Sequence, residues 1–326
     1  MKKRRKQIAI ILFVLLILSF LLLLSDTLLN DKNKKTYNIS IIVRGKNSES
    51  LMTMKKGIDQ AASEMNVNIN FITLSEENRV LEQTELIEEE IRNKADAIII
   101  DPADYENMKE PIEKAMNKVP VILIESTVKS DRVLSSVSCD NYNLGVSLGK
   151  EMIQMGNTRA NIAIVKNNLE CSSIKDRYDG FMSVMKDTDN TFISWQFLGQ
   201  EQQNYYFQAK KLLEDNAVDV VVIFDTGMLE MVAQEKKDLR SINKEKKFAE
   251  IYGTGSTNKI ISFLEDKVIS ATGIQNEFNI GYLGVEAAVY RINGKDIKNN
   301  TISSTVINKR NMYSEENQRL LFPFIR

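Results

Sequence analysis

The chain of 326 residues contains no histidine, only two cysteines and only four prolines. Without histidine, Ser-His-Asp and Cys-His activation of a nucleophile is excluded, and so are most zinc sites. Two cysteines, Cys139 and Cys171, do not make a disulfide framework, so the sequence leaves open either one bridge or two free thiols. These absences predict a protein that is not an enzyme and that carries no cofactor or metal.

The chain also lacks an excess of charge of one sign. Its 43 Lys and Arg residues against 44 Asp and Glu residues give a formal net charge of −1, and outside the N-terminus the two signs are interspersed. A nucleic-acid surface needs a basic patch or stripe. We therefore expect no nucleic-acid partner.

The one long apolar segment lies at the N-terminus. Five cationic residues at positions 2–6 precede an uncharged, mostly apolar segment at 7–24. As a helix this segment would be about 27 Å long, close to the roughly 30 Å hydrocarbon core of a bilayer, and the cations favour a cytoplasmic N-terminus. The sequence thus predicts a cytoplasmic tail at 1–6, a transmembrane anchor at 7–25 and a linker at 26–36.

A cleaved signal peptide is the alternative interpretation of this segment. The charged start fits a signal peptide, but the apolar segment is long for one and no Ala-x-Ala-like cleavage site follows it. No cysteine ends the segment, so lipoprotein anchoring has no acceptor. An uncleaved anchor is favoured, which places everything beyond it outside the cell. A cytoplasmic tail of six residues is too short for a signalling domain, so any signal across the membrane must pass through a partner protein.

From residue 37 onward, short apolar segments alternate with amphipathic ones. Several apolar segments are continuous β-branched stretches, as expected of parallel strands covered on both faces. The candidate strands are 39–43, 67–73, 97–100, 119–125, 161–165, 192–197, 218–224 and 250–253. The candidate helices are 50–65, 77–93, 105–117, 143–155, 175–185, 203–215, 228–238, 258–266 and 279–292. Alternation of this kind predicts right-handed βαβ units, and this many strands predict two lobes.

Several segments of the chain, taken in order, resemble the type I periplasmic-binding proteins for sugars. They are ADAIIIDP at 95–102, CDNYNLG at 139–145, DRYDGF at 176–181, FDTGM at 224–228, ATGIQNEFNIG at 271–281 and YLGVEAA at 282–288. The resemblance implies an α/β fold of two Rossmann-like lobes with parallel sheets, joined by three hinge strands. It implies a membrane-proximal lobe of 37–139 and 276–304, and a distal lobe of 140–275 and 305–326.

The resemblance also implies a ligand site in the cleft between the lobes, beyond the carboxyl ends of the strands. Arg177 falls where the sugar-binding relatives keep an arginine that reaches ligand hydroxyls, and a planar fork of donors suits adjacent oxygens. Gln275 falls on the hinge amide of the ribose-type relatives, and Asp225 falls where a side chain accepts ligand hydroxyls. We expect Arg177 to lie at the solvated rim of the cleft.

Other positions depart from the family pattern. Asn47 and Ser48 stand in a first loop where the relatives carry aromatic rings, and Glu125 with Ser126 replaces their Asp-Arg pair. The loss of stacking rings removes the apolar faces that hold a pyranose. Either the ligand differs from a typical sugar, or the cleft binds weakly, or recognition of a partner has replaced ligand sensing. The candidate ligand-binding residues are Asn47, Ser48, Glu125, Arg177, Asp225 and Gln275.

Two functions are compatible with these features. The first is a membrane-tethered extracellular solute-binding protein for a sugar-like ligand that acts as a sensor subunit for a membrane partner. The chain resembles anchored relatives that partner membrane histidine kinases. The alternative is the substrate-binding component of an ABC sugar transporter, whose partner is the permease. Both place the chain at the cell membrane.

Overall fold

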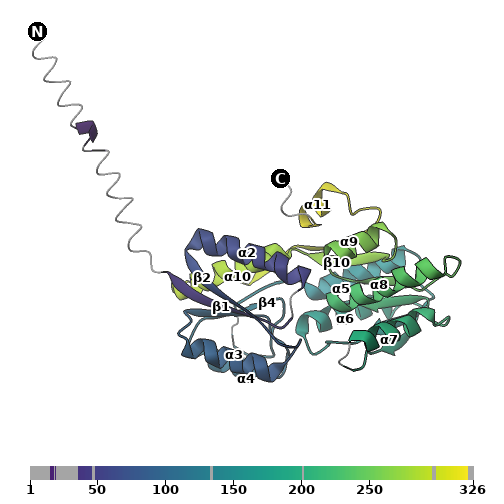
Figure 1. Ribbon diagram of the computed structural model, residues 1–326, viewed down its shortest axis with the longest axis horizontal. Coiled ribbons are helices and arrows are strands. Elements are labelled where there is room, and N and C mark those ends of the chain that lie inside the picture. Colours follow the sequence, from purple (N-terminus) through teal and green to yellow (C-terminus); the bar gives the residue numbers. More distant parts are fainter. Residues whose placement is uncertain are drawn as a thin grey trace, which may run out of the picture.

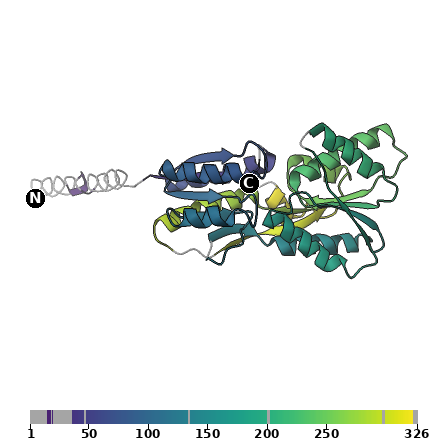
Figure 2. The ribbon, with the colours of Figure 1, turned by 90° about the horizontal axis from the view of Figure 1, so that it is seen from below.

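Two six-stranded sheets form the core of two lobes (Figures 1 and 2). The computed structural model describes residues 15–17, 19, 36–45, 48–132, 135–199, 202–295 and 299–321. The strand orders are β11-β5-β4-β3-β1-β2 in the first sheet and β12-β10-β9-β8-β6-β7 in the second. The predicted α/β class and the two lobes are therefore confirmed.

The first sheet is parallel throughout, and the second is parallel except for one edge. The strands of the first sheet are β1 (Tyr37–Val43), β2 (Val67–Thr73), β3 (Ala97–Ile100), β4 (Val121–Ile124), β5 (Ser135–Cys139) and β11 (Asn300–Ile302). Those of the second sheet are β6 (Asn161–Val165), β7 (Thr191–Trp195), β8 (Val220–Ile223), β9 (Glu250–Thr254), β10 (Ala271–Gln275) and β12 (Ser304–Asn308). Only β12 runs antiparallel, alongside β10.

Helices cover both faces of each sheet (Figure 1). On the first sheet, α2 (Glu49–Met65) and α10 (Glu277–Ile292) lie on one face, and α3 (Val80–Arg92) and α4 (Lys109–Met116) on the other. On the second, α5 (Asn141–Gln154) and α6 (Ser172–Met185) lie on one face. The other face carries α7 (Gln202–Glu214), α8 (Thr226–Ile242), α9 (Asn258–Glu265) and α11 (Glu315–Leu321). One apolar cluster fills each interface, and the central strands β3, β4 and β8 are buried along their whole length.

The chain crosses between the lobes three times, each time through a single residue. The crossings are Asp140 between β5 and α5, Asn276 between β10 and α10, and Ser303 between β11 and β12. Ser304 already pairs with Gln275 in the second sheet, so the predicted lobe limit after residue 304 is one residue late. The sequence of this segment gave no sign of where one edge strand ends and the next begins.

The two lobes touch each other beyond the crossings. The hydroxyl oxygens of Ser126 in the first lobe and Ser173 in the second lie 2.8 Å apart. At another point, the backbone N–H of Asn258 donates to the Glu49 carboxylate across 3.0 Å, and the Asn258 side-chain amide donates to the same group. The lobes are thus closed on each other.

Two further expectations concern the N-terminus and the cysteines. The predicted tail at 1–6, nearly all of the predicted anchor at 7–25 and the linker up to residue 35 lie outside the described residues. In the parts of the chain that the structure describes, no helix is both long and apolar enough to cross a bilayer. Cys139 and Cys171 are both buried and free, so the alternative of two separate thiols holds.

Candidate functional site: the cleft between the lobes

A cavity of about 370 Å³ opens between the lobes at the carboxyl ends of the strands. This volume falls in the range of small-molecule sites, and open α/β sheets bind ligands at this edge. We call it the cleft cavity. Its lining residues in the first lobe are Arg44, Gly45, Ser48, Glu49, Ser50, Leu51, Met54, Glu77, Asp101 and Glu125. Those in the second lobe are Ile174, Arg177, Phe224, Asp225, Thr226, Gly227, Glu230 and Lys259.

A buried ion pair lies on the first-lobe wall of the cleft cavity. Arg44 follows β1 and Asp101 follows β3, and because these strands are neighbours their side chains meet, with Arg44 Nε 3.1 Å from Asp101 Oδ2. Burial raises the pKa of the Asp101 carboxyl to about 7 despite the nearby guanidinium. Burial opposes the charge of Arg44 as well, but the surrounding acidic groups hold its pKa above the ordinary value. The cleft cavity therefore has a buried ion pair on its first-lobe wall.

A second polar cluster joins the lobes. Arg177 Nη2 of the second lobe lies 3.6 Å from Glu125 Oε2 of the first, and Gln275 Nε2 donates to Glu125 Oε1 across 2.5 Å. Arg177 is 6 % exposed, and its Nε donates to Asn141 Oδ1 across 2.7 Å. The expectation of a solvated rim position for Arg177 is therefore wrong. The close packing of α6 on α5 directs the guanidinium into the junction of the lobes.

Glu125 has a strained backbone at this junction. Its φ of 60° lies in the left-handed region, which costs a residue with a side chain about 1–3 kcal/mol and persists where the surroundings enforce it. Here the Glu125 carbonyl accepts a hydrogen bond from Ser138 Oγ across 2.6 Å, and its N–H donates to the carbonyl of Val137 across 3.2 Å. The fold thus holds the Glu125 side chain against the second lobe.

Two of the predicted ligand residues cap helices. Ser48 accepts a hydrogen bond from Leu51 N at the start of α2, and Asp225 accepts one from Met228 N at the start of α8. The other carboxylate oxygen of Asp225 accepts from Asn168 Nδ2 across 3.1 Å. Both residues line the cleft cavity, but their oxygens already serve the fold. The predicted Asn47 lies outside the described residues.

Gln275 lines a smaller neighbouring cavity of about 190 Å³ beside the crossings, which we call the hinge cavity. Its lining residues are Glu49, Ser50, Met52, Thr53, Lys56, Ser256, Thr257, Asn258, Gln275, Asn276, Glu277, Phe278, Leu320 and Leu321. Gln275 Nε2 also donates to Glu277 Oε1 across 3.2 Å. Burial, and then repulsion from Glu125, raise the pKa of the Glu277 carboxyl to about 8. Gln275 thus links Glu125 in the cleft cavity to Glu277 in the hinge cavity.

Four buried side-chain oxygens and one buried nitrogen at this junction lack a hydrogen-bond partner among the described residues. They are Asp101 Oδ1, Glu125 Oε2, Gln275 Oε1, Glu277 Oε2 and Arg44 Nε. Buried polar atoms are nearly always hydrogen-bonded, so each such exception calls for an explanation. A ligand that donates hydrogen bonds would satisfy acceptors of this kind.

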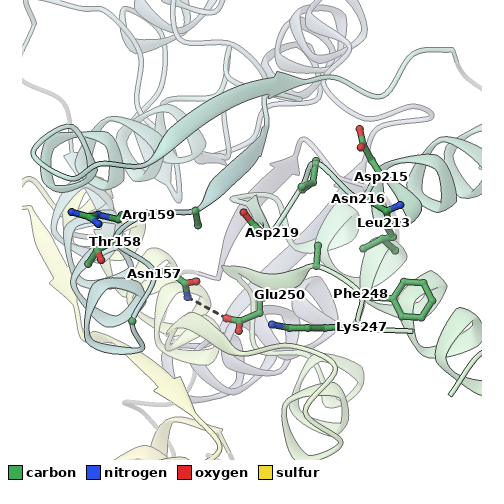
Figure 3. Close-up of a pocket in the computed structure, with 14 residues that line it drawn as sticks. Asn157, Thr158, Arg159, Leu213, Asp215, Asn216, Asp219, Lys247, Phe248 and Glu250 are labelled. Carbon is green, nitrogen blue, oxygen red and sulfur yellow. Dashed lines mark hydrogen bonds between the residues drawn. The ribbon is translucent and has the colours of Figure 1, made fainter. Parts of the chain in front are cut away.

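A hollow of similar size, about 350 Å³, lies at the amino ends of β6, β8 and β9 (Figure 3). There Asn157 Nδ2 donates to Glu250 Oε2 across 3.1 Å, as the dashed line in Figure 3 shows. Asp219 in turn accepts from the backbone N–H of Asn161 across 2.9 Å. These side chains hold the ends of the sheet together, so the cleft cavity is the better candidate.

Three of the predicted ligand residues, Glu125, Arg177 and Gln275, come together in one cluster. Three charged residues near them, Arg44, Asp101 and Glu277, were not among the predicted ligand residues. A signal for them existed, because each is a charged residue within two positions of a strand end.

Comparisons with known proteins agree on one fold. A family model described as "Periplasmic binding protein domain" matches residues 39–296. The ribose import binding protein RbsB of Bacillus subtilis (strain 168) is 25 % identical over 282 residues, covering 84 % of this chain and 88 % of that protein.

Solved structures are similar over most of the chain. A carbohydrate transporter solute binding protein from Agrobacterium radiobacter, in complex with D-arabinose, has a TM-score of 0.79 at 21 % identity, covering 88 % of this chain and 99 % of that one. The XylFII-LytSN complex contains a chain with a TM-score of 0.74 at 24 % identity, covering 85 % of this chain and 99 % of that one. At these identities the solved structures bear on the fold alone.

Proposed function

The chain belongs to the periplasmic binding protein domain family, and from this premise we propose that it is an extracytoplasmic receptor for a small, sugar-like polar ligand. The resemblance seen in the sequence is confirmed at the level of the family. The relatives are solute-binding proteins, in agreement with the prediction that this chain is not an enzyme. The membrane-anchored sensor variant stays a proposal.

The observation that carries this proposal is the set of unpartnered acceptors at the lobe junction. Asp101 Oδ1 and Glu125 Oε2 belong to residues that line the cleft cavity, and both atoms are buried. A polyhydroxylated ligand supplies O–H donors at short spacing, which suits acceptors on neighbouring strands. The relatives support the same ligand class, since one is named for ribose import and another is solved with D-arabinose.

Lobe closure is the proposed response to the ligand. The contacts between Arg177 and Glu125, and between Glu49 and Asn258, form only when the lobes lie together. A ligand held by both lobes shifts the equilibrium toward this closed form by its differential affinity for the two forms. We expect Glu125, Arg177 and Gln275 to contribute most to the stability of the closed form, because they already join the lobes. Asn47, Ser48 and Asp225 complete the proposed binding set.

For the partner, we favour a membrane-tethered sensor that signals through a protein such as a histidine kinase. The apolar segment at 7–24 and the short preceding tail support this choice. Likeness of fold to XylFII, which has been solved in a complex with LytSN, adds support. The second candidate is the binding component of an ABC sugar transporter, which the relationship to a ribose import binding protein favours.

Thermal unfolding of the protein against a panel of pentoses, hexoses and polyols tests ligand binding. A ligand at 100 times its Kd adds about 2.7 kcal/mol to the stability of the folded state. We expect at least one compound to raise the Tm of the wild type and of Glu88→Gln, an exposed-surface control on α3, and to raise the Tm of Glu125→Gln by a smaller amount. A panel without any shift would contradict the proposal.

Deletion of the gene separates the two partners. If the chain is a transport receptor, the deletion strain loses uptake of the identified ligand. If the chain is a sensor, uptake machinery remains but ligand-dependent transcription is lost, and a kinase co-purifies with the full-length protein from solubilised membranes. Loss of uptake with unchanged transcriptional response would contradict the sensor.

A further inference from the structure

The cleft cavity is lined by more acidic than basic side chains. Among its lining residues that the structure describes, six carry carboxyl groups and three carry cationic groups. The acidic residues are Glu49, Glu77, Asp101, Glu125, Asp225 and Glu230, and the cationic residues are Arg44, Arg177 and Lys259. The Lys259 side chain is 70 % exposed and lies 3.9 Å from Glu230, so it is an edge group rather than a donor inside the cavity.

The donors of Arg177 are already engaged by the protein. Its Nε donates to Asn141 Oδ1, its Nη1 donates to Thr254 Oγ1 across 3.3 Å, and its Nη2 faces Glu125. A guanidinium has five N–H groups, so these contacts use most of its capacity. A ligand that needed strong donors from Arg177 would have to break bonds that hold the second lobe together.

Arg44 is only partly engaged, so among the described residues this wall has one open donor, Arg44 Nε, beside two open acceptors. Arg44 Nη1 donates to Asn78 Oδ1 across 3.3 Å, and its Nε lies 3.1 Å from Asp101. Asp101 is 4 % exposed and its Oδ1 has no hydrogen-bond partner among the described residues, and Glu125 Oε2 has none either. These two carboxyl groups follow neighbouring strands, and the charge of Glu125 helps to raise the pKa of Asp101.

A ligand that binds beside the Asp101 and Glu125 carboxyl groups should carry hydrogen-bond donors and positive charge. Each hydroxyl of a neutral sugar brings one donor together with two lone pairs that need donors of their own, whereas an ammonium group has three donors and no acceptor. We propose that the cleft cavity takes a hydroxylated amine, such as an amino sugar or amino polyol, with its ammonium group held between the Asp101 and Glu125 carboxylates. This inference rests on the proposed function, since it assumes that the cleft is the binding site.

The expected consequence is an order of preference set by ligand charge. The ammonium group favours the ionised form of Asp101, which burial and Glu125 oppose, and makes charge-assisted hydrogen bonds, which are about twice as strong as neutral ones. An acidic sugar adds a third negative charge to the same wall. We expect the amine to bind about tenfold or more tightly than the neutral compound of the same skeleton, and the acid more weakly than both.

Calorimetric titration of the full-length protein in detergent with three matched sets of compounds tests this order. The sets are glucose, glucosamine and glucuronate; galactose, galactosamine and galacturonate; and glucitol, glucamine and gluconate. At about pH 6.5 the amines are protonated. Asp101→Asn and Glu125→Gln should each reduce the advantage of the amine about tenfold while the neutral compound still binds. Glu88→Gln, which makes the same change in net charge on the exposed surface of α3, should leave the advantage unchanged.

The outcomes separate this inference from the proposed function. If the neutral compound binds as tightly as the amine in every set that binds, or if the acid binds best, the charge preference is overturned and the proposed function stands. If no compound of any set binds, the proposed function is overturned and the inference falls with it. If both cleft variants keep the full advantage of the amine, the ammonium group is not held by Asp101 and Glu125, and the assignment is wrong.

Discussion

Arg177 joins the lobes from a buried position, and its removal should harm folding as well as binding. Without the guanidinium, the Glu125 carboxylate is left buried with Gln275 as its remaining hydrogen-bond partner. Breaking a buried pair in this way costs about 3–5 kcal/mol. We therefore expect Arg177→Ala to lower the free energy of unfolding by that amount in urea titrations.

The control for Arg177 is an exposed ion pair in the same lobe. Arg159 and Asp189 lie 3.0 Å apart, and their side chains are 82 % and 72 % exposed. Pairs of this kind contribute about 0–1 kcal/mol, so Arg159→Ala should be close to neutral. Equal effects of Arg177→Ala and Arg159→Ala would show that Arg177 is solvated after all.

Glu277 makes the stability of the fold depend on pH. The pKa of its carboxyl is raised from 4.5 to about 8 by burial and by Glu125, so the folded state keeps a proton that the unfolded chain releases above about pH 4.5. This group therefore lowers the stability as pH rises from about 4.5 to 8, and adds no further change above that range. Glu277→Gln should gain stability relative to the wild type across this range.

Urea midpoints measured at several pH values between about 4 and 9 give this comparison directly. The difference between Glu277→Gln and the wild type should grow with pH and then become constant above about pH 8. A difference that is independent of pH would mean that Glu277 is ionised in the folded protein.

At the residue scale, the sequence predicted which residues follow the strands, but not which of these residues lie next to each other. The resemblance placed Glu125, Arg177 and Gln275 in one cleft, and the structure brings them together. Arg44 and Asp101 meet because β1 lies beside β3, and strand order within a sheet cannot be read from periodicity. The burial of Arg177 likewise depends on distant residues, Asn141, Thr254 and Glu125, and could not be predicted from the local sequence.

At the scale of elements, α5 and α6 pack so closely that one position of α5 accepts only glycine. A Cβ on Gly145 would lie 2.0 Å from the carbonyl oxygen of Arg177, whereas a Cβ on Gly149, about one turn later, would meet its nearest atoms at 3.4 Å. Overpacking costs about 1–3 kcal/mol, while alanine favours a helix over glycine by about 1 kcal/mol. Gly145→Ala should therefore destabilise the protein and Gly149→Ala should not.

Chemical unfolding of the two α5 variants, followed by circular dichroism, measures this contrast. The Gly145→Ala protein that does fold should also bind the ligand more weakly. The added Cβ displaces the backbone carbonyl of Arg177, and with it the position of this residue. Similar stabilities for the two variants would contradict the close packing of α5 on α6.

Periodicity revealed the strands with continuous apolar or β-branched stretches and missed the short strands with several small or polar residues. All eight candidate strands exist, and the β-branched stretches of β3, β4 and β8 lie at the centres of the sheets. The missed strands β5, β10, β11 and β12 are short and carry Ser, Thr, Gly or Asn. Their positions depend on pairing with distant strands, which local sequence does not encode.

At the scale of the whole molecule, closure covers the thiol of Cys171. Its Sγ donates to the carbonyl oxygen of Ala103 in the other lobe across 3.1 Å, and the residue is fully buried. Burial also raises the pKa of this thiol to about 12, so it reacts slowly while the lobes are closed. Opening of the cleft removes the cover that the first lobe provides, which makes Cys171 a natural reporter of lobe motion.

The rate of Cys171 alkylation, with and without an identified ligand, tests most directly whether ligand binding closes the two lobes. The experiment uses a Cys139→Ala background, so that one thiol remains. We predict that saturating ligand slows alkylation severalfold in this protein, and that the same ligand concentration slows it less when Glu125→Gln is added. An unchanged rate, under conditions where calorimetry shows that the ligand is bound, would contradict closure of the cleft on its ligand.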